Sequence, residues 1–263
     1  MNLQLHGKRA LVCGSSQGLG LASAIELSQL GAEVTLVSRN AEKLQQALSK
    51  LNAVDSKGHD YVVADFSQPT EALDILGGKI KEKEGYHVLI NNAGGPPAGN
   101  VMGLEVEDYQ QGFDMHFHMV HELSKMMVPG MKAAGFGRIV NILSVSVKQP
   151  IDELPVSNMI RAGIANWAKT LSNEISKYGI TVNNVLPGMT ETERLDYLFE
   201  KRAEMAGTSV EEIKKRLSAS VPAGRLGRPE ELGAVVAFLC SPAAAYVTGI
   251  CVPVDGGSTR IAF

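Results

Sequence analysis

Residues 9–20, RALVCGSSQGLG, place a glycine-rich loop between a short apolar run and an alanine-rich segment. The run at 9–13 has the character of a buried strand, and the segment at 19–30 has helical spacing. The loop carries three glycines, Gly14, Gly18 and Gly20. Glycines permit a tight turn and let a pyrophosphate approach backbone N–H groups where the helix begins. This order predicts a dinucleotide site, with a glycine turn that binds no ligand as the alternative.

The same alternation of short apolar runs and helical segments continues along the chain. The predicted strands are 9–13, 33–37, 61–64, 87–90, 137–143, 181–186 and 250–254. The predicted helices are 19–30, 41–51, 71–83, 106–134, 156–178 and 229–240. Because 106–134 exceeds an ordinary helix, we expect Pro129 to break it. This order of elements predicts an α/β fold with a parallel sheet and helices on both faces.

The length of the chain bounds the number of domains. A chain of 263 residues is at the top of the range for one hydrophobic core, so we expect one domain over residues 1–263. The charged stretch 190–227, between the last two strands, breaks the alternation. It predicts a small helical lid, in which Tyr197, Phe199 and Met205 cover a substrate or pack the lid onto the body. A solvated pair of surface helices is the alternative.

Composition and charge exclude several classes of protein. Hydrophobic residues make up 44% and charged residues 20% of the chain, which are values of an ordinary globular protein. The 25 basic and 28 acidic residues give a formal charge of −3 without a basic block, so we expect no nucleic-acid partner. No apolar run approaches the roughly 20 residues that span a bilayer. With no signal-peptide pattern and three scattered cysteines, we expect a cytoplasmic protein with buried thiols.

The end of the second predicted strand indicates which dinucleotide is bound. An NAD site ordinarily has a carboxylate there to bind the ribose 2′-hydroxyl, and this chain has Ser38 and Arg39 instead. A guanidinium suits a 2′-phosphate, so NADP(H) is favoured over NAD(H). The alternative is that Arg39 points into water. The glycine loop supplies no second cation, because Gln17 stands at the position where a basic residue could be. After the third strand, Asp65 can bind the adenine amino group or be a surface-loop residue.

Four motifs carry a resemblance to a known family: Gly14-x-x-x-Gly18-x-Gly20, Asn91-Asn92-Ala93-Gly94, Pro187-Gly188 and Asp255-Gly256-Gly257. In order and spacing, over essentially the whole chain, the sequence resembles the classical short-chain dehydrogenase/reductase family. The resemblance implies a Rossmann-type, doubly wound parallel sheet of seven strands in the order 3-2-1-4-5-6-7. It also implies a homotetramer, or a dimer, assembled through two long helices. The cofactor contacts expected from motif and spacing are Gly14, Ser15, Ser16, Gln17, Gly18, Leu19, Gly20, Ser38, Arg39, Asp65, Phe66, Asn91, Ala93, Gly94, Pro187, Gly188, Thr190 and Thr192.

The resemblance also locates the catalytic positions, three of which are changed. The family transfers a hydride between nicotinamide and a carbonyl or alcohol carbon with the help of Asn, Ser, Tyr and Lys. Ser144 matches the serine, whereas Ser157 stands at the tyrosine position, Arg161 at the lysine position and His116 at the asparagine position. A serine hydroxyl is a far weaker acid than a phenol, and arginine does not release its proton.

The changed residues can still act on a carbonyl. Ser144 and Ser157 can donate hydrogen bonds to a developing oxyanion, and Arg161 can hold the nicotinamide ribose or add positive charge. His116 and Lys148 are the candidate proton donors. The alternatives are that His116 only packs a helix and that Lys148 is a solvated loop residue.

We expect no metal, although three histidines lie close together in the sequence. At about 100° per residue, His116 and His118 point to nearly opposite faces of a helix, and His121 does not complete a site with them.

The function predicted from the resemblance is an NADP(H)-dependent oxidoreductase of the 3-oxoacyl-acyl-carrier-protein reductase-like branch. That branch includes divergent members with Ser-Asn-x-x-Arg, the pattern at 157–161. The expected partner is a small carbonyl or alcohol substrate, or an acyl thioester. One alternative is a non-catalytic dinucleotide-binding protein that senses redox state or assembles with others. A non-redox lyase or isomerase stays open, because fold does not fix function.

Overall fold

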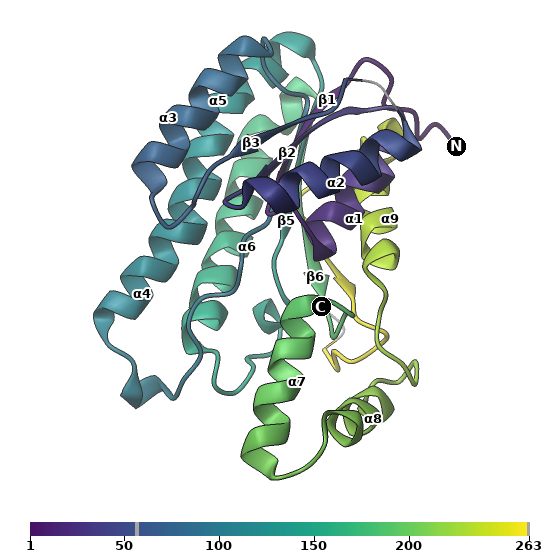
Figure 1. Cartoon of the computed structure of the whole chain (residues 1–263). Helices are drawn as coiled ribbons and strands as arrows, with labels where there is room; N and C mark the ends of the chain where they lie inside the picture. Colours follow the sequence, from purple (N-terminus) through teal and green to yellow (C-terminus); the bar gives the residue numbers. More distant parts are fainter. Residues whose placement is uncertain (56–57, 262–263) are drawn as a thin grey trace.

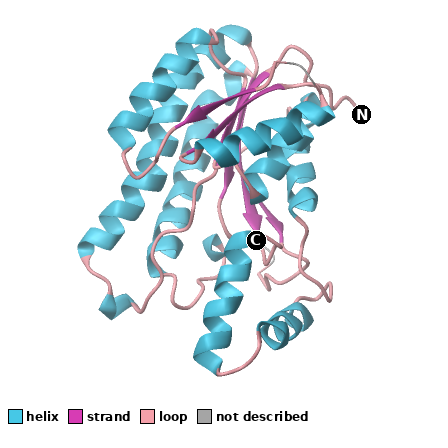
Figure 2. Ribbon diagram, in the orientation of Figure 1, coloured by secondary structure: helices cyan, strands magenta, loops and turns pink. Residues whose placement is uncertain are grey.

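A parallel sheet of seven strands runs through the centre of the protein (Figures 1 and 2). The computed structural model describes residues 1–55 and 58–261. The strand order is β3-β2-β1-β4-β5-β6-β7, which confirms the predicted topology. The strands are β1 Arg9–Cys13, β2 Glu33–Ser38, β3 Asp60–Val63, β4 Val88–Asn91, β5 Gly137–Ile142, β6 Ile180–Pro187 and β7 Cys251–Val254. Almost all residues of β1, β2, β4, β5 and β6 are buried, which explains their continuous apolar runs, whereas the edge strands β3 and β7 are mostly half-buried.

Helices cover both faces of the sheet and form two main hydrophobic cores. On one face pack α1 Gly18–Gln29, α2 Ala41–Val54 and α9 Pro229–Cys240. On the other pack α3 Pro69–Glu82, α5 Met119–Ala134 and α6 Pro155–Ile175. Short 3₁₀ turns follow at Val101–Gly103, Val145–Val147, Ser176–Tyr178 and Pro242–Ala244. Among the described residues, no helix combines the length and apolar character needed to span a bilayer.

Two helices fill the segment between β6 and β7. They are α7 Glu193–Ala206 and α8 Val210–Ser220, which project below the sheet in Figure 1. Phe199, Ala203, Ile213 and Leu226 form a small core of their own. Phe199 is 1% exposed in that core, so it packs the insertion and does not face a substrate. A bridge between Thr190 and Gly227 joins the two ends of this α7–α8 insertion (residues 190–227).

The long helical segment before β5 is interrupted, but not at the position we expected. Helix α4 Val106–Phe113 passes through a π-helical turn, Asp114–His118, into α5. Pro129 lies inside α5, so the expected break there is wrong. Pro129 is on the exposed side, while Met127 and Met131 are buried in the core. Their burial offsets the roughly 3 kcal/mol that an interior proline costs a helix.

Two of the three cysteine thiols are buried, as we expected for all three. Cys13 and Cys240 are buried, and burial raises the pKa of each thiol to about 12. Cys251 is half-buried and accepts a hydrogen bond from Asn184 Nδ2 at 3.4 Å. All three cysteines are free.

A buried histidine, His59, and a half-buried one, His87, make the stability of the fold sensitive to acid. The backbone N–H of Val34 donates to His59 Nδ1 at 3.0 Å, and that of Arg9 donates to His87 Nδ1 at 3.1 Å. Each bond requires that the accepting ring nitrogen carries no proton. Burial lowers the pKa of both, that of His87 to about 4. The unfolded chain binds these protons more readily than the folded protein does. The two histidines therefore stabilise the fold above about pH 6.5, and their contribution is lost as the pH falls toward about 4.

We expect the free energy of unfolding to fall by about 1–2 kcal/mol between pH 7 and pH 5 from these two rings. A shift of this size lowers Tm by about 2–8 °C. Thermal unfolding across this pH range measures it, and His59→Gln with His87→Gln should reduce the slope. The exposed His118→Gln is the control. An unchanged slope in the double variant would assign the acid sensitivity to other groups.

Candidate active site

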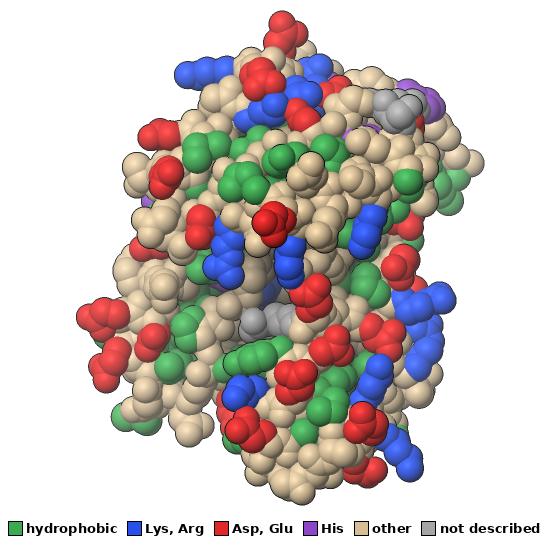
Figure 3. Space-filling view, viewed as in Figure 1, with side chains coloured by type: hydrophobic (Ala, Val, Ile, Leu, Met, Phe, Trp, Pro, Cys, Tyr) green, Lys and Arg blue, Asp and Glu red, His purple; other side chains and the backbone are tan. Residues whose placement is uncertain are grey.

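A cleft of about 830 Å³ opens at the carboxyl ends of the strands. Figure 3 shows basic side chains along the upper rim of this hollow and acidic side chains on the lobe below it. Most of the residues predicted for a site line this one cleft: Gly14, Ser16, Gln17, Gly18, Leu19, Ser38, Arg39, Asp65, Phe66, Ala93, Gly94, Ser144, Ser157, Arg161, Pro187, Gly188, Thr190 and Thr192. The structure therefore brings residues from the carboxyl ends of six strands, β1 to β6, together with α6 and the α7–α8 insertion, to one place.

The glycine loop is packed so closely that two of its three glycines, Gly14 and Gly20, have no room for a side chain. Gly14 has φ of +57°, and a Cβ there would lie 2.6 Å from Asn92 Nδ2. A Cβ on Gly20 would lie 2.2 Å from the carbonyl oxygen of Gly14. Asn92 Nδ2 also donates to that oxygen at 3.0 Å, which fixes the loop against the end of β4. The bare backbone at the start of α1 fits a pyrophosphate.

Serines and basic side chains gather where β2 ends. The hydroxyls of Ser16 and Ser38 lie 3.0 Å apart, and Arg39 is exposed at the rim. Lys43 also lines the cleft, and the sequence reasoning missed it. Its Nζ donates to Gln17 Oε1 at 2.6 Å, so α2 supplies the cation that the glycine loop lacks. The sequence feature that could have identified it is a lysine in the first turn of the helix that follows the second strand.

Three predicted contacts lie behind the wall of the cleft. Ser15 is fully buried, and its hydroxyl donates to Val12 O at 2.6 Å and accepts from Val37 N at 2.9 Å. It therefore joins β1 to β2 through its side chain. Gly20 serves loop packing, as described above. Asn91 Nδ2 donates to Asn141 Oδ1 at 2.8 Å, within the strands of the sheet.

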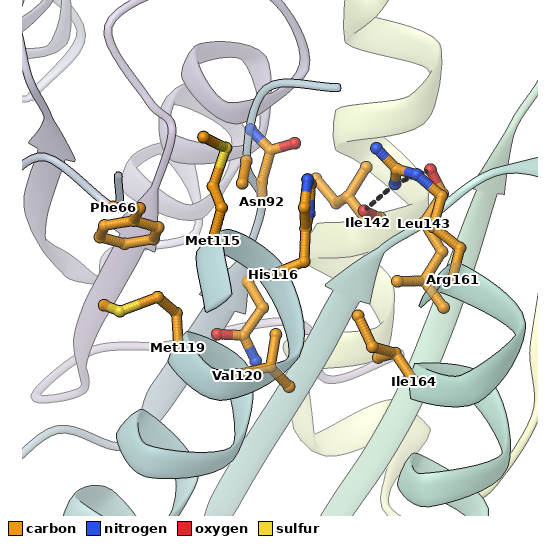
Figure 4. A pocket seen from close by; sticks show the side chains of 12 residues that line it. Phe66, Asn92, Met115, His116, Met119, Val120, Ile142, Leu143, Arg161 and Ile164 are labelled. Atoms are coloured by element: carbon orange, nitrogen blue, oxygen red, sulfur yellow. Dashed lines mark hydrogen bonds between the residues drawn. The ribbon is translucent and has the colours of Figure 1, made fainter. Parts of the chain in front are cut away.

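Ser144, Ser157 and Arg161 meet at the opposite end of the cleft. Arg161 Nε donates to Ser157 Oγ at 3.1 Å, and Nη1 donates to the carbonyl oxygens of Ile142, at 3.2 Å, and Leu143 (Figure 4). The guanidinium thus ties α6 to the end of β5. Ser144 Oγ accepts from Ser146 N at 3.0 Å and begins the turn Val145–Val147, so its hydroxyl hydrogen can still be donated.

The two candidate proton donors occupy different positions. His116 lies in the π-helical turn, is 6% exposed and lines a small pocket of about 20 Å³ that adjoins the cleft and shares part of its lining. Figure 4 shows its ring between Asn92 and Ile142, and Arg161, beyond Leu143, lines both the pocket and the cleft. A space of this size holds about one water molecule. Lys148 is half-buried beyond the turn Val145–Val147 and is not among the residues that line either space.

The histidines near this pocket are arranged for packing and surface pairing. His121 stacks on Phe117 with ring centroids 5.9 Å apart, and His118 Nδ1 lies 3.9 Å from Asp114 Oδ1. Within residues 1–55 and 58–261, no group of three His, Cys, Asp or Glu side chains is placed to hold a metal ion.

Comparison with known proteins gives the family. The family model described as enoyl-(acyl carrier protein) reductase matches residues 14–259. The 3-oxoacyl-[acyl-carrier-protein] reductase of Pseudomonas aeruginosa is 35% identical over 97% of this chain and 98% of its own length. The chain belongs to the short-chain dehydrogenase/reductase family. It is an oxidoreductase of the 3-oxoacyl-acyl-carrier-protein reductase-like group within that family.

Solved structures of the family agree with this assignment. L-sorbose reductase of Gluconobacter frateurii, complexed with NADPH and L-sorbose, has a TM-score of 0.94 at 30% identity and covers 99% of this chain and 100% of its own. A putative 2-deoxy-D-gluconate 3-dehydrogenase of Agrobacterium tumefaciens with bound NADP has a TM-score of 0.85 at 31% identity, and 98% of each chain is covered. These two members contain NADP(H), and the glycine loop and basic rim of the present protein fit such a ligand.

Proposed function

We propose that the protein reduces a carbonyl substrate with NADPH, which it prefers to NADH. The observation that carries this proposal is the shared cleft, which joins the basic 2′ end of a dinucleotide site to Ser144, Ser157 and Arg161. A 3-oxoacyl thioester or a related ketone is the proposed substrate, because a relative of 35% identity is a reductase of that class. We place the protein in the cytoplasm as one domain over residues 1–263.

The chain's own residues suit each part of the cofactor. The glycine loop would bind the pyrophosphate, Ser38 and Arg39 the 2′-phosphate, and Asp65 the adenine. Ala93, Gly94, Pro187, Gly188, Thr190 and Thr192 are proposed for the remaining contacts, and Asn91, behind the wall, is proposed to support them. When bound, the nicotinamide supplies the hydride. The α7–α8 insertion would close over the cleft as a lid, because Thr192, Glu193, Leu195 and Leu198 line it.

The reacting oxygen would be held at the other end of the cleft. Ser144 and Ser157 are proposed to donate hydrogen bonds to it, and the fixed charge of Arg161 stabilises the negative charge that develops there. His116 would supply the proton through a water molecule in the adjoining pocket, because it does not line the cleft itself. Lys148 would take this role only after a movement of its loop. For the assembly we propose a homotetramer, or a dimer, through the long helices α5 and α6.

The first test is a fluorescence titration of the purified protein with NADPH and NADH. We expect tighter binding of NADPH, and we expect Arg39→Gln to weaken NADPH by about 10- to 50-fold with NADH changed less than threefold, because the lost contact is charge-assisted. Arg202→Gln, which removes a charge from α7 away from the cleft, is the control. Equal affinity for the two cofactors would contradict the preference.

A second measurement separates catalysis from simple binding. Consumption of NADPH is followed with a panel of 3-oxoacyl thioesters and ketones. Turnover with any of them supports the reductase. Tight NADPH binding without turnover across the panel would favour the non-catalytic alternative, which these relatives do not support.

A further inference from the structure

Two oppositely charged side chains meet across the mouth of the cleft. Lys43 lies in the first turn of α2, and Glu193 is the first residue of α7. Lys43 Nζ lies 3.1 Å from Glu193 Oε2 while it also donates to Gln17 Oε1. This contact connects the α7–α8 insertion with α2 and the glycine loop, on the opposite side of the cleft.

The surroundings of Lys43 suit an anion of higher charge than a carboxylate. Ser16, Ser38 and Arg39 line the same cleft, and the N-terminus of α2 adds positive potential beside them. A phosphate monoester carries about −1.5 to −2 charges at pH 7 and has three strong acceptor oxygens. The side chains of Lys43 and Glu193 are 46% and 65% exposed, so water and salt screen their pairing and a stronger anion can displace it.

Glu193 is ionised at neutral pH, because the hydrogen bond from Lys43 holds its pKa below the usual range. Its negative charge therefore has two effects at this site. It occupies the ammonium group of Lys43, and it repels any phosphate that approaches Arg39 and Ser38.

We propose that Lys43 is the second cation of the 2′-phosphate subsite and that Glu193 competes with the phosphate for it. Binding of a 2′-phosphorylated dinucleotide exchanges the Lys43–Glu193 pair for a Lys43–phosphate pair, which releases the N-terminus of α7 from α2. Lys43 and Glu193 together then determine the selectivity for a 2′-phosphate and the contact between the α7–α8 insertion and α2. The inference rests on the proposed function, since it requires that the dinucleotide lies in this cleft.

The test compares ligands that differ only in the 2′-phosphate. NADPH is compared with NADH by fluorescence, and adenosine 2′,5′-bisphosphate with AMP by calorimetry, so that the second pair lacks the nicotinamide. Lys43→Gln should weaken the two 2′-phosphorylated ligands by about 5- to 20-fold and the other two less than twofold. Glu193→Gln should tighten the phosphorylated ligands by about 2- to 5-fold, and this gain should be smaller in the Lys43→Gln background, where only the repulsion between Glu193 and the phosphate is relieved.

The controls remove the same charges at the other end of α7. Lys201 and Glu204 form an exposed pair at 3.0 Å, so Lys201→Gln and Glu204→Gln should leave all four affinities unchanged. Equal effects of Lys43→Gln on all four ligands, or weaker NADPH binding in Glu193→Gln, would overturn the inference. If Lys43→Gln and Glu193→Gln both leave the preference for phosphorylated ligands unchanged, the inference is overturned and the proposed function stands. A wild-type protein that binds neither dinucleotide would overturn both.

Discussion

Arg161→Met should lower kcat/KM for the carbonyl substrate by about 10²- to 10³-fold while the protein still folds. Methionine fills a similar volume but removes every donor, so it leaves Ser157 and the carbonyl oxygens of Ile142 and Leu143 without the guanidinium. It also removes the positive charge closest to Ser157, and losing one such contact to a developing oxyanion typically costs this much. Steady-state kinetics and NADPH titration measure the two effects separately, and we expect affinity to change less than tenfold.

Two further variants decide how Arg161 acts. Arg161→Lys keeps the charge but cannot reproduce the planar fork, so it should retain more activity than Arg161→Met if charge matters most. Lys169→Met, an exposed position two turns later in α6, is the control for the loss of a cation. If the loss in Arg161→Met follows its lowered Tm and disappears at low temperature, Arg161 only anchors α6 and the proposed electrostatic role is wrong.

Local patterns predicted the strands, the glycine loop and the basic end of the second strand, whereas the strand order and the catalytic positions came from the resemblance to the family. The apolar strands, the glycine loop and the pair Ser38 and Arg39 at the end of β2 are each set by neighbours close in the chain. Lys43 was missed because its role depends on contact with Gln17 and Glu193, the latter 150 residues away. No periodicity in the sequence reports such a contact.

The break expected at Pro129 is wrong, and the direction of His116 was left open, because both depend on how the helix packs. Proline disfavours a helix interior, but the burial of Met127 and Met131 outweighs that preference at Pro129. The π-helical turn at Asp114–His118 changes the facing of the residues around it, so regular helical spacing does not locate His116. The structure places His116 beside the cleft and not in it, which the sequence left open.

His116→Leu should reduce kcat by about 10²-fold near pH 7, with NADPH affinity changed less than threefold. The substitution keeps an apolar side chain of moderate size in the pocket but removes the group that can transfer a proton. Because the proposed proton transfer uses the imidazole, the wild-type rate should depend on pH, and the variant's profile should be flatter. Initial rates from pH 5.5 to 8.5 at saturating NADPH measure both effects.

Controls for this prediction come from the same turn and from the other candidate donor. His118→Gln changes a neighbouring histidine that pairs with Asp114 at the surface, so its rate and pH profile should match the wild type. His116→Gln keeps hydrogen bonding without the titration, and it should resemble His116→Leu if proton transfer is what matters. Wild-type rates and pH dependence in both His116 variants would exclude the histidine. The same defect in Lys148→Gln would then identify Lys148 as the donor, brought to the cleft by movement of the segment after Val145–Val147.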